Sequence, residues 1–215
     1  MTSHDTLKPI LKKAPVVPVV VIDNPNDAVP VAKALVAGGI PTIEVTMRTS
    51  AAAESIAAIV EQVPEAVVGA GTVLSPKQAE AIVKAGAKFI VSPGFHEDVV
   101  ATAEKLSVPV IPGIATATEA QQAWNHGLRL LKFFPAEQAG GVATIKALAA
   151  VFRDVLFVPT GGISTSNLEE YLSLPAVLAC GGSWLTPAKL IADDDFGGIT
   201  KLAREALALA NKVRG

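Results

Sequence analysis

The sequence predicts an α/β protein, a compact (β/α)8 TIM barrel with an extra N-terminal helix. Eight short apolar runs alternate with alanine-rich stretches of helical length. Repeated strand and helix units form a parallel sheet with helices outside, and eight of them in 215 residues suit a closed barrel of minimal size. An open doubly wound sheet is the alternative. The first run continues as Val-Val-Ile-Asp-Asn-Pro-Asn, however, and lacks the glycine fingerprint of such sheets.

Each expected strand is an apolar run bounded by turn-forming residues. The strands are expected at Val16–Ile22, Pro41–Thr46, Ala66–Ala70, Lys88–Ser92, Val108–Pro112, Arg129–Phe134, Val155–Pro159 and Ala176–Cys180. The helices are expected at 1–14, 26–38, 51–62, 76–86, 96–106, 117–127, 140–151, 165–173 and 196–213. Several helices begin at a capping residue and several end at glycine, which readily terminates a helix. The expected caps are Ser75, Thr116 and Ser164, and the expected terminal glycines are Gly38, Gly86 and Gly127.

No linker or low-complexity segment divides the chain, so residues 1–215 are expected to form a single domain. Half of the residues are hydrophobic, which supplies ample core. The N-terminal segment carries charges where a secretory signal needs an apolar region. The most apolar stretch, Val16–Ile22, is too short to span a bilayer. We expect neither export nor a membrane role.

Charge and cysteine content narrow the class of partner. The net charge is −2 and only 5% of residues are aromatic, so no basic surface with stacking side chains is expected to bind nucleic acid. A small anionic substrate needs only local positive charge. Cys180 is the only cysteine, and its apolar setting is typical of a core residue rather than a reactive thiol. These features suit a cytoplasmic location.

Lys132 stands in an apolar run, Leu-Arg-Leu-Leu-Lys-Phe-Phe-Pro, that reads as a buried strand. Burial disfavours the charged ammonium, and a neutral amine is a nucleophile that can form a Schiff base with a ketone. The simpler alternative is a lysine at a strand end whose long stem reaches water or an ion-pair partner. The run alone leaves both alternatives open.

A second strand brings acidic and basic groups to one face. Period-two alternation in Ile-Pro-Thr-Ile-Glu-Val-Thr-Met-Arg places Thr42, Glu44, Thr46 and Arg48 on the same side. If this strand and that of Lys132 line one cavity, then an amine, a base and an anion clamp converge, as carbonyl chemistry on a keto acid requires. An ion pair between Glu44 and Arg48 at the strand end is the simpler alternative.

Glycine-rich segments follow the last two expected strands. They read Pro-Thr-Gly161-Gly162-Ile-Ser and Gly181-Gly182-Ser183. At the carboxyl ends of strands seven and eight of a barrel, backbone amides without side chains form a phosphate site. Considered by itself, each glycine pair has a simpler explanation, because loops often need residues that adopt a positive φ. Two such loops at neighbouring strand ends favour phosphate binding.

No metal site and no cofactor are expected. His4, His96 and His126 are scattered, and no cluster with ligand spacing joins them. His126 precedes Gly127 and reads as a cation at a helix C-terminus, and Asp193–Asp195 reads as a solvated loop.

Over nearly its whole length the chain resembles the family of 2-keto-3-deoxy-6-phosphogluconate (KDPG) aldolase, of the bacterial type that also handles 4-hydroxy-2-oxoglutarate (KHG). The motifs that carry the resemblance are Glu-Val-Thr-Met-Arg-Thr, Val-Gly-Ala-Gly-Thr-Val-Leu, Ser-Pro-Gly, Leu-Lys-Phe-Phe-Pro-Ala-Glu, Pro-Thr-Gly-Gly-Ile-Ser and Gly-Gly-Ser-Trp-Leu. The resemblance implies a β/α barrel, a Schiff-base lysine and a homotrimer. It also implies carbohydrate metabolism through the Entner-Doudoroff pathway.

The resemblance also implies roles for individual residues. Lys132 becomes the Schiff-base lysine and Glu44 the general acid and base. The remaining residues become substrate contacts: Arg48 and Thr72 at the pyruvate carboxylate, Pro93 and Phe134 beside the pyruvyl group, Thr160 on the aldehyde side, and Gly161, Gly162 and Ser183 at the phosphate. We therefore expect a class I aldolase that cleaves KDPG to pyruvate and glyceraldehyde 3-phosphate, and KHG to pyruvate and glyoxylate.

Two alternatives stay open. One is a catalytically silent barrel that binds a phosphorylated sugar acid, and the other is a phosphate-binding barrel isomerase, which fold alone does not exclude.

Overall fold

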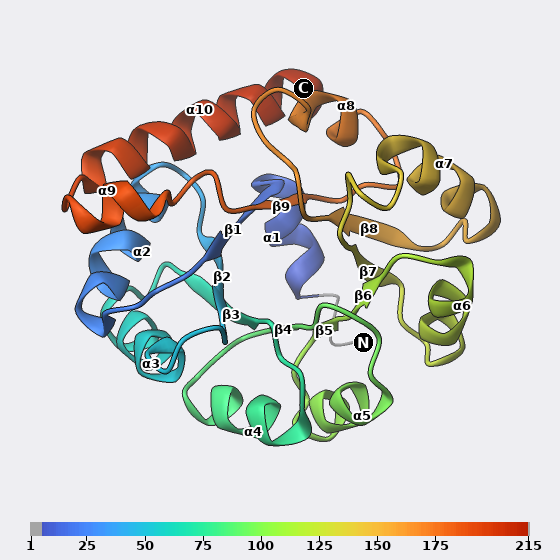
Figure 1. Cartoon of the computed structure of the whole chain (residues 1–215), viewed down its shortest axis with the longest axis horizontal. Coiled ribbons are helices and arrows are strands. Elements are labelled where there is room, and N and C mark those ends of the chain that lie inside the picture. The colour runs from blue at the N-terminus through green and yellow to red at the C-terminus, as the bar shows by residue number, and fades with distance from the viewer. Residues whose placement is uncertain (1–5, 215) are drawn as a thin grey trace.

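A computed structural model of the chain describes residues 6–214 as an α/β fold with a curled parallel sheet (Figure 1). The strands are β1 (Val16–Val20), β2 (Thr42–Thr46), β3 (Val67–Gly71), β4 (Ile90–Val91), β5 (Val110–Ile111), β6 (Gly113–Ile114), β7 (Leu130–Phe133), β8 (Leu156–Pro159) and β9 (Cys180–Gly182). One sheet has the order β5-β4-β3-β2-β1-β9 and another the order β6-β7-β8. All of these pairings are parallel, so the carboxyl ends of neighbouring strands lie at one edge.

Helices cover the sheet, and all of them except the first lie on its outer side (Figure 1). They are α1 (Leu7–Lys13), η2 (Pro25–Asp27), α2 (Ala28–Ala37), α3 (Ala52–Gln62), α4 (Pro76–Lys84), α5 (Glu97–Lys105), α6 (Ala117–Asn125), α7 (Gly141–Val151), α8 (Leu168–Leu172), α9 (Ala188–Ala192) and α10 (Phe196–Arg214). Capping residues define the ends of several helices. Ser75 accepts a hydrogen bond from the Gln78 N–H, and Thr116 forms a capping box with Glu119. Gly127 follows α6 with a φ of 78°, which glycine adopts without strain.

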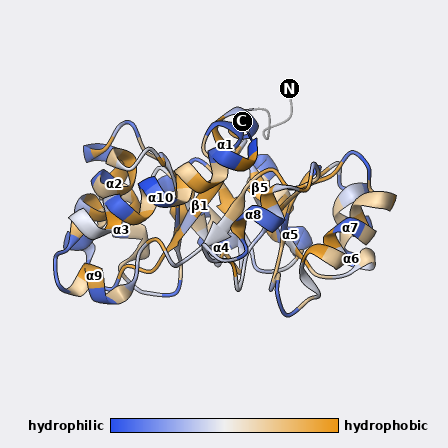
Figure 2. Ribbon diagram, turned by 90° about the horizontal axis from the view of Figure 1, so that it is seen from above, coloured by the Kyte–Doolittle hydropathy of each residue, from blue (hydrophilic) through white to orange (hydrophobic). Residues whose placement is uncertain are grey.

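The helix α1 differs from the others because it lies across one end of the strands. Figure 2 shows it standing on one side of the ring. Its Leu7 and Leu11 are buried in a cluster with Val17, Phe89 and Leu130, which lie at the starts of β1, β4 and β7. A separate, larger cluster fills the space between the strands and the outer helices. The helix α1 therefore covers the amino ends of the strands and leaves the carboxyl ends for a site.

Most expected elements are confirmed, with shifted ends. A helix was expected at 1–14; α1 occupies Leu7–Lys13, and residues 1–5 lie outside the described part. The expected fifth strand, Val108–Pro112, is found as β5, and Pro112, which has no N–H to donate, separates it from the short strand β6, which was not expected. The helix α9 was not expected. No helix among residues 6–214 has the length and apolar character that crossing a membrane requires.

Two predictions near the C-terminus were wrong in detail. The last strand was expected at Ala176–Cys180 but is Cys180–Gly182, and only Val177 of the expected run forms an isolated bridge, with Phe157. Glycine has a low strand propensity, so the apolar run before it gave the stronger signal. Ser164 does not cap α8, which begins only at Leu168, because residues 162–167 form a hydrogen-bonded turn instead.

Candidate active site

A cavity of about 330 Å³ opens at the carboxyl ends of the strands. Every residue that the sequence singled out for the site lines this cavity: Glu44, Arg48, Thr72, Pro93, Lys132, Phe134, Thr160, Gly161, Gly162 and Ser183. Val19, Ile163 and Gly182 line it as well. The first two were missed because an aliphatic side chain carries no chemical signal in a sequence. The cavity has the size of a small-molecule site.

Lys132 and Glu44 meet at the floor of the cavity. Lys132 lies on β7 and Glu44 on β2, 88 residues apart in the chain, yet Nζ of Lys132 is 3.3 Å from Oε1 of Glu44. The two side chains are only 7% and 4% exposed. Burial weakens each charge's contact with water, so each charge depends strongly on the other. An amine beside a carboxylate, shielded from bulk water, is an arrangement suited to imine chemistry.

The expected alternative for Glu44, an ion pair with Arg48, is wrong. Glu44 pairs with Lys132, whereas Arg48 is exposed at the end of β2 and forms no ion pair with any carboxylate in residues 6–214. Arg48 still lines the cavity. Its guanidinium is therefore available to an anionic ligand, and its fork of donors suits a carboxylate.

Thr72 has an unusual backbone conformation at the cavity wall. It follows β3 and has a φ of 58°, which is a costly value for a β-branched residue. Pro93 and Phe134 contribute apolar walls, and the Phe134 ring centroid lies 5.2 Å from Nζ of Lys132. Thr160 is buried at the end of β8, where it bridges to Gly181 of β9.

The loop after β8 is shaped for an anion. Gly161 and Gly162 have φ values of 99° and 79°, so the need for positive φ is real at both positions. The side chain of Asn167 holds the turn by donating to the Gly162 carbonyl and accepting from the Ser164 N–H. Within residues 6–214, the N–H groups of Gly161, Gly162 and Ile163 donate to no other part of the chain. Amide groups left free in this way can bind phosphate.

Glu137 and Tyr171 support the loop that contains Gly161 and Gly162. A Cβ atom at Gly162 would lie 2.3 Å from Cγ of Glu137, so the loop packs directly on that side chain. The hydroxyl of the buried Tyr171 on α8 donates to the Glu137 carboxylate. Burial, followed by this hydrogen bond to a carboxylate, raises the pKa of Tyr171. Tyr171 therefore remains a hydrogen-bond donor and holds Glu137 in place.

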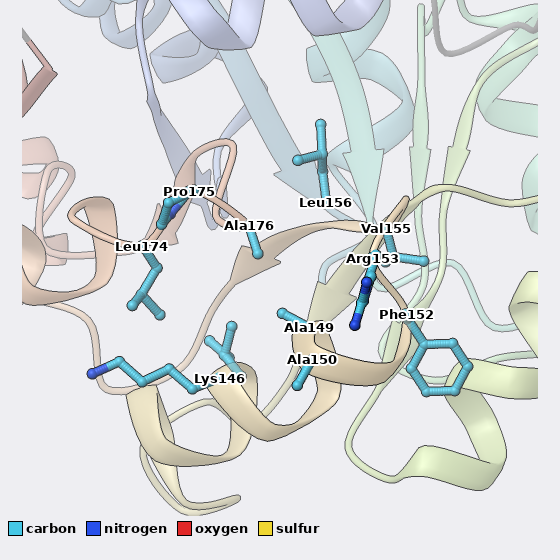
Figure 3. Close-up of a pocket in the computed structure, with 11 residues that line it drawn as sticks. Lys146, Ala149, Ala150, Phe152, Arg153, Val155, Leu156, Leu174, Pro175 and Ala176 are labelled. Carbon is cyan, nitrogen blue, oxygen red and sulfur yellow. The ribbon is translucent and has the colours of Figure 1, made fainter.

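A groove of about 420 Å³ lies between α7 and the chain that follows α8 (Figure 3). Its walls are mainly alkyl side chains, with Phe152 and the cations Lys146 and Arg153. No carboxylate, histidine or cysteine lines it. It therefore lacks the acid and base groups that gather around Lys132.

The remaining titratable candidates lie away from the cavity. His96 is exposed at the start of α5, and His126 follows α6 with its Nε2 3.9 Å from Glu97. In the described part of the chain, no three His, Cys, Asp or Glu side chains gather closely enough to hold a metal ion. Cys180 is buried, and burial raises the pKa of its thiol. Asp193–Asp195, expected as a solvated loop, are exposed between α9 and α10, where the Asp195 carboxylate accepts a hydrogen bond from the Gly198 N–H in the first turn of α10.

Comparison with known proteins matches the chain to a family of aldolases. Residues 7–202 match the family described as KDPG and KHG aldolase. The KHG/KDPG aldolase of Escherichia coli K12 is 51% identical over 198 residues, which is 92% of this chain and 93% of that protein. A structure of the Zymomonas mobilis KDPG aldolase with 3-phosphoglycerate superimposes with a TM-score of 0.91, at 44% identity, and covers 97% of each chain. The Legionella pneumophila KDPG aldolase, with pyruvate captured as a covalent carbinolamine intermediate, gives 0.90 at 41% identity over 93% of this chain and 97% of that one.

Proposed function

The chain belongs to the KDPG and KHG aldolase family, and from this premise we propose that it is a class I aldolase that cleaves KDPG to pyruvate and glyceraldehyde 3-phosphate. We propose that it also cleaves KHG to pyruvate and glyoxylate. The observation that carries the proposal is the buried pair of Lys132 and Glu44, in a cavity also lined by Arg48, which pairs with no carboxylate among residues 6–214. The carbinolamine captured in the Legionella relative supports covalent chemistry on pyruvate.

Lys132 begins the proposed reaction as a nucleophile. Its Nζ adds to the keto carbon of the substrate, and loss of water gives an iminium that accepts electrons from the bond to be broken. Glu44 takes the proton from the hydroxyl on carbon 4, directly or through one water, and the bond between carbons 3 and 4 then breaks. The electron pair moves to the iminium, which becomes an enamine, and the aldehyde leaves. Protonation of carbon 3 and hydrolysis release pyruvate and restore the amine.

The other cavity residues are proposed to hold the two ends of the substrate. Arg48 and Thr72 bind the pyruvate carboxylate, because the guanidinium lies at the cavity rim without a carboxylate partner in residues 6–214. Pro93 and Phe134 pack beside the pyruvyl group. Thr160, which directly precedes Gly161 and lines the same cavity, contacts the aldehyde side.

Gly161, Gly162 and Ser183 are proposed to bind the phosphate. The free amides of the loop after β8 and the exposed Ser183 after β9 line the same cavity. The helix α8 begins only at Leu168, and none of its residues lines the cavity. The support therefore comes from the loop amides and the hydroxyl rather than from a helix end.

The finer features of the fold are proposals of the same kind. We propose that the sheet closes as a (β/α)8 barrel of one domain. The bridges Phe157–Val177 and Thr160–Gly181 link β8 to the segment of β9, and only Pro112 separates β5 from β6. The family resemblance supports a homotrimer, and the lone buried Cys180 suits a cytoplasmic location.

A direct assay of cleavage tests the function. Purified protein is incubated with KDPG, and pyruvate release is followed through oxidation of NADH by lactate dehydrogenase. We expect release with wild type and none with Lys132→Arg, which keeps a charge but cannot form an imine. Absence of pyruvate with both KDPG and KHG, together with retained binding of KDPG, would favour a silent barrel. Parallel reactions with KHG measure the second activity.

A further inference from the structure

The last residue of β3 is Gly71, which has no side chain, whereas Thr72 directly after it lines the cavity. A Cβ atom built on Gly71 would lie 2.1 Å from Oε1 of Glu44, and 2.7 Å from its Cδ and Cγ. Real Cβ atoms do not approach so closely. The space that any other residue would fill at position 71 is therefore occupied by the carboxylate of Glu44.

The oxygen that occupies this space is the one that faces Lys132. Oε1 of Glu44 is 3.3 Å from Nζ of Lys132. The β3 backbone pairs alongside β2, with Thr46 opposite Gly71, so the glycine lies diagonally next to Glu44 on the neighbouring strand. A side chain at position 71 would push Oε1 away from where it meets the amine.

Space, rather than backbone conformation, requires the glycine. The φ of Gly71 is outside the left-handed region, unlike those of Gly161 and Gly162, so an L-residue can adopt its backbone without strain. Gly69, two residues earlier and on the same face, leaves room in the same way for the ring of Phe89, at 2.4 Å. The space at both glycine positions on this face of β3 is thus filled by side chains from other parts of the chain.

We propose that Gly71 is a positioning residue that sets where the Glu44 carboxylate stands relative to Lys132. The inference rests on the proposed function, because it assigns to Glu44 the proton transfers of that reaction. The clash in Gly71→Ala falls on side-chain atoms of Glu44 and not on its backbone, so we expect the carboxylate to shift and the fold to be retained. A displacement of roughly 1 Å in a reacting group can cost about 10²-fold in rate, so we expect a loss of about 10- to 100-fold in proton transfer.

Exchange of the pyruvate methyl protons with D₂O, followed by NMR, measures this step without an aldehyde. We expect Gly71→Ala to slow exchange while its pyruvate KM stays close to wild type. The matched control is Gly94→Ala, which lies outside the cavity lining, has a Cβ position open to space and is expected to exchange like wild type. Thermal unfolding confirms that each variant is folded.

A double-variant comparison separates positioning from general damage to β3. In a Glu44→Gln background, which has no carboxylate to position, Gly71→Ala should cause no further loss. An equal loss in both backgrounds, or wild-type exchange in Gly71→Ala, would overturn the proposal. If Gly71→Ala does not fold, the shorter carboxylate of Gly71→Ala/Glu44→Asp should restore folding, and failure to do so also overturns it. Wild type that neither exchanges nor cleaves instead refutes the proposed function itself.

Discussion

Nζ of Lys132 and Oε1 of Glu44 lie 3.3 Å apart, in side chains that are 7% and 4% exposed. This pairing predicts that pyruvate and borohydride together modify the protein at Lys132, because reduction fixes an imine that only a nucleophilic amine forms. Peptide mass mapping locates the adduct. The exposed Lys88 supplies the control, since Lys88→Arg should be labelled like wild type and Lys132→Arg not at all. An adduct on another lysine would contradict the assignment.

Replacement of the carboxylate predicts a loss of rate with little loss of binding. Glu44→Gln keeps the size of the side chain but removes the base, and general acid and base catalysis typically contributes ~10² to 10⁴ in rate. We expect kcat for KDPG cleavage to fall within that range, while pyruvate binding changes far less. Imine trapping also slows, because forming the imine requires proton transfer. Turnover near that of wild type would show that Glu44 is not the general acid and base but only the ion-pair partner of Lys132.

Much of the site was predictable because its chemistry is carried by polar residues in apolar strands. The apolar alternation placed Glu44 and Lys132 on strands, and parallel strands bring their carboxyl ends together. The role of Gly71 was not predictable, because a missing side chain has no signal of its own. The atom it accommodates belongs to Glu44, 27 residues earlier on another strand, so only the folded register reveals the contact. The shift of β9 has a similar cause, since glycines form it.

The buried ion pair also predicts a stability effect that is independent of any substrate. Lys132→Met leaves the Glu44 carboxylate buried without its partner, and breaking such a pair typically costs about 3–5 kcal/mol of unfolding free energy. Denaturant unfolding measures the loss, and Lys132→Met/Glu44→Leu should recover much of it. Lys189→Met is the control, because the Lys189–Asp193 pair is largely exposed and such pairs contribute about 0–1 kcal/mol. Equal stability of Lys132→Met and wild type would show that the ion pair of Lys132 and Glu44 does not contribute to the free energy of unfolding.

Arg48 is predicted to act on binding rather than on bond cleavage. Arg48→Met keeps much of the stem but removes the donors, and a hydrogen bond to a charged group is worth about 1.5–3 kcal/mol. The affinity for pyruvate should fall by about 10- to 150-fold at that free-energy cost, as measured by the pyruvate concentration dependence of borohydride trapping. Arg153→Met, in the groove beside α7, provides the control and should bind pyruvate like wild type. Unchanged affinity for pyruvate in Arg48→Met would show that Arg48 does not bind the pyruvate carboxylate.

The loop after β8 predicts that the phosphate aids catalysis from a distance. Binding energy from a non-reacting group can position the reacting carbons. The kcat/KM of unphosphorylated substrate should therefore be far lower than that of KDPG. Trapping of pyruvate, which carries no phosphate, should depend far less on the phosphate site. Ser183→Ala should reduce kcat/KM for KDPG and leave that for KHG, which has no phosphate, nearly unchanged. Gly162→Val should produce the same loss, but it also strains a residue with a φ of 79° and strikes Glu137, so Ser183→Ala is the cleaner test. Ser173→Ala, an exposed serine beyond α8, serves as the control. Equal efficiency with phosphorylated and unphosphorylated substrates, and an unaltered ratio in Ser183→Ala, would leave Gly161 and Gly162 as turn residues only.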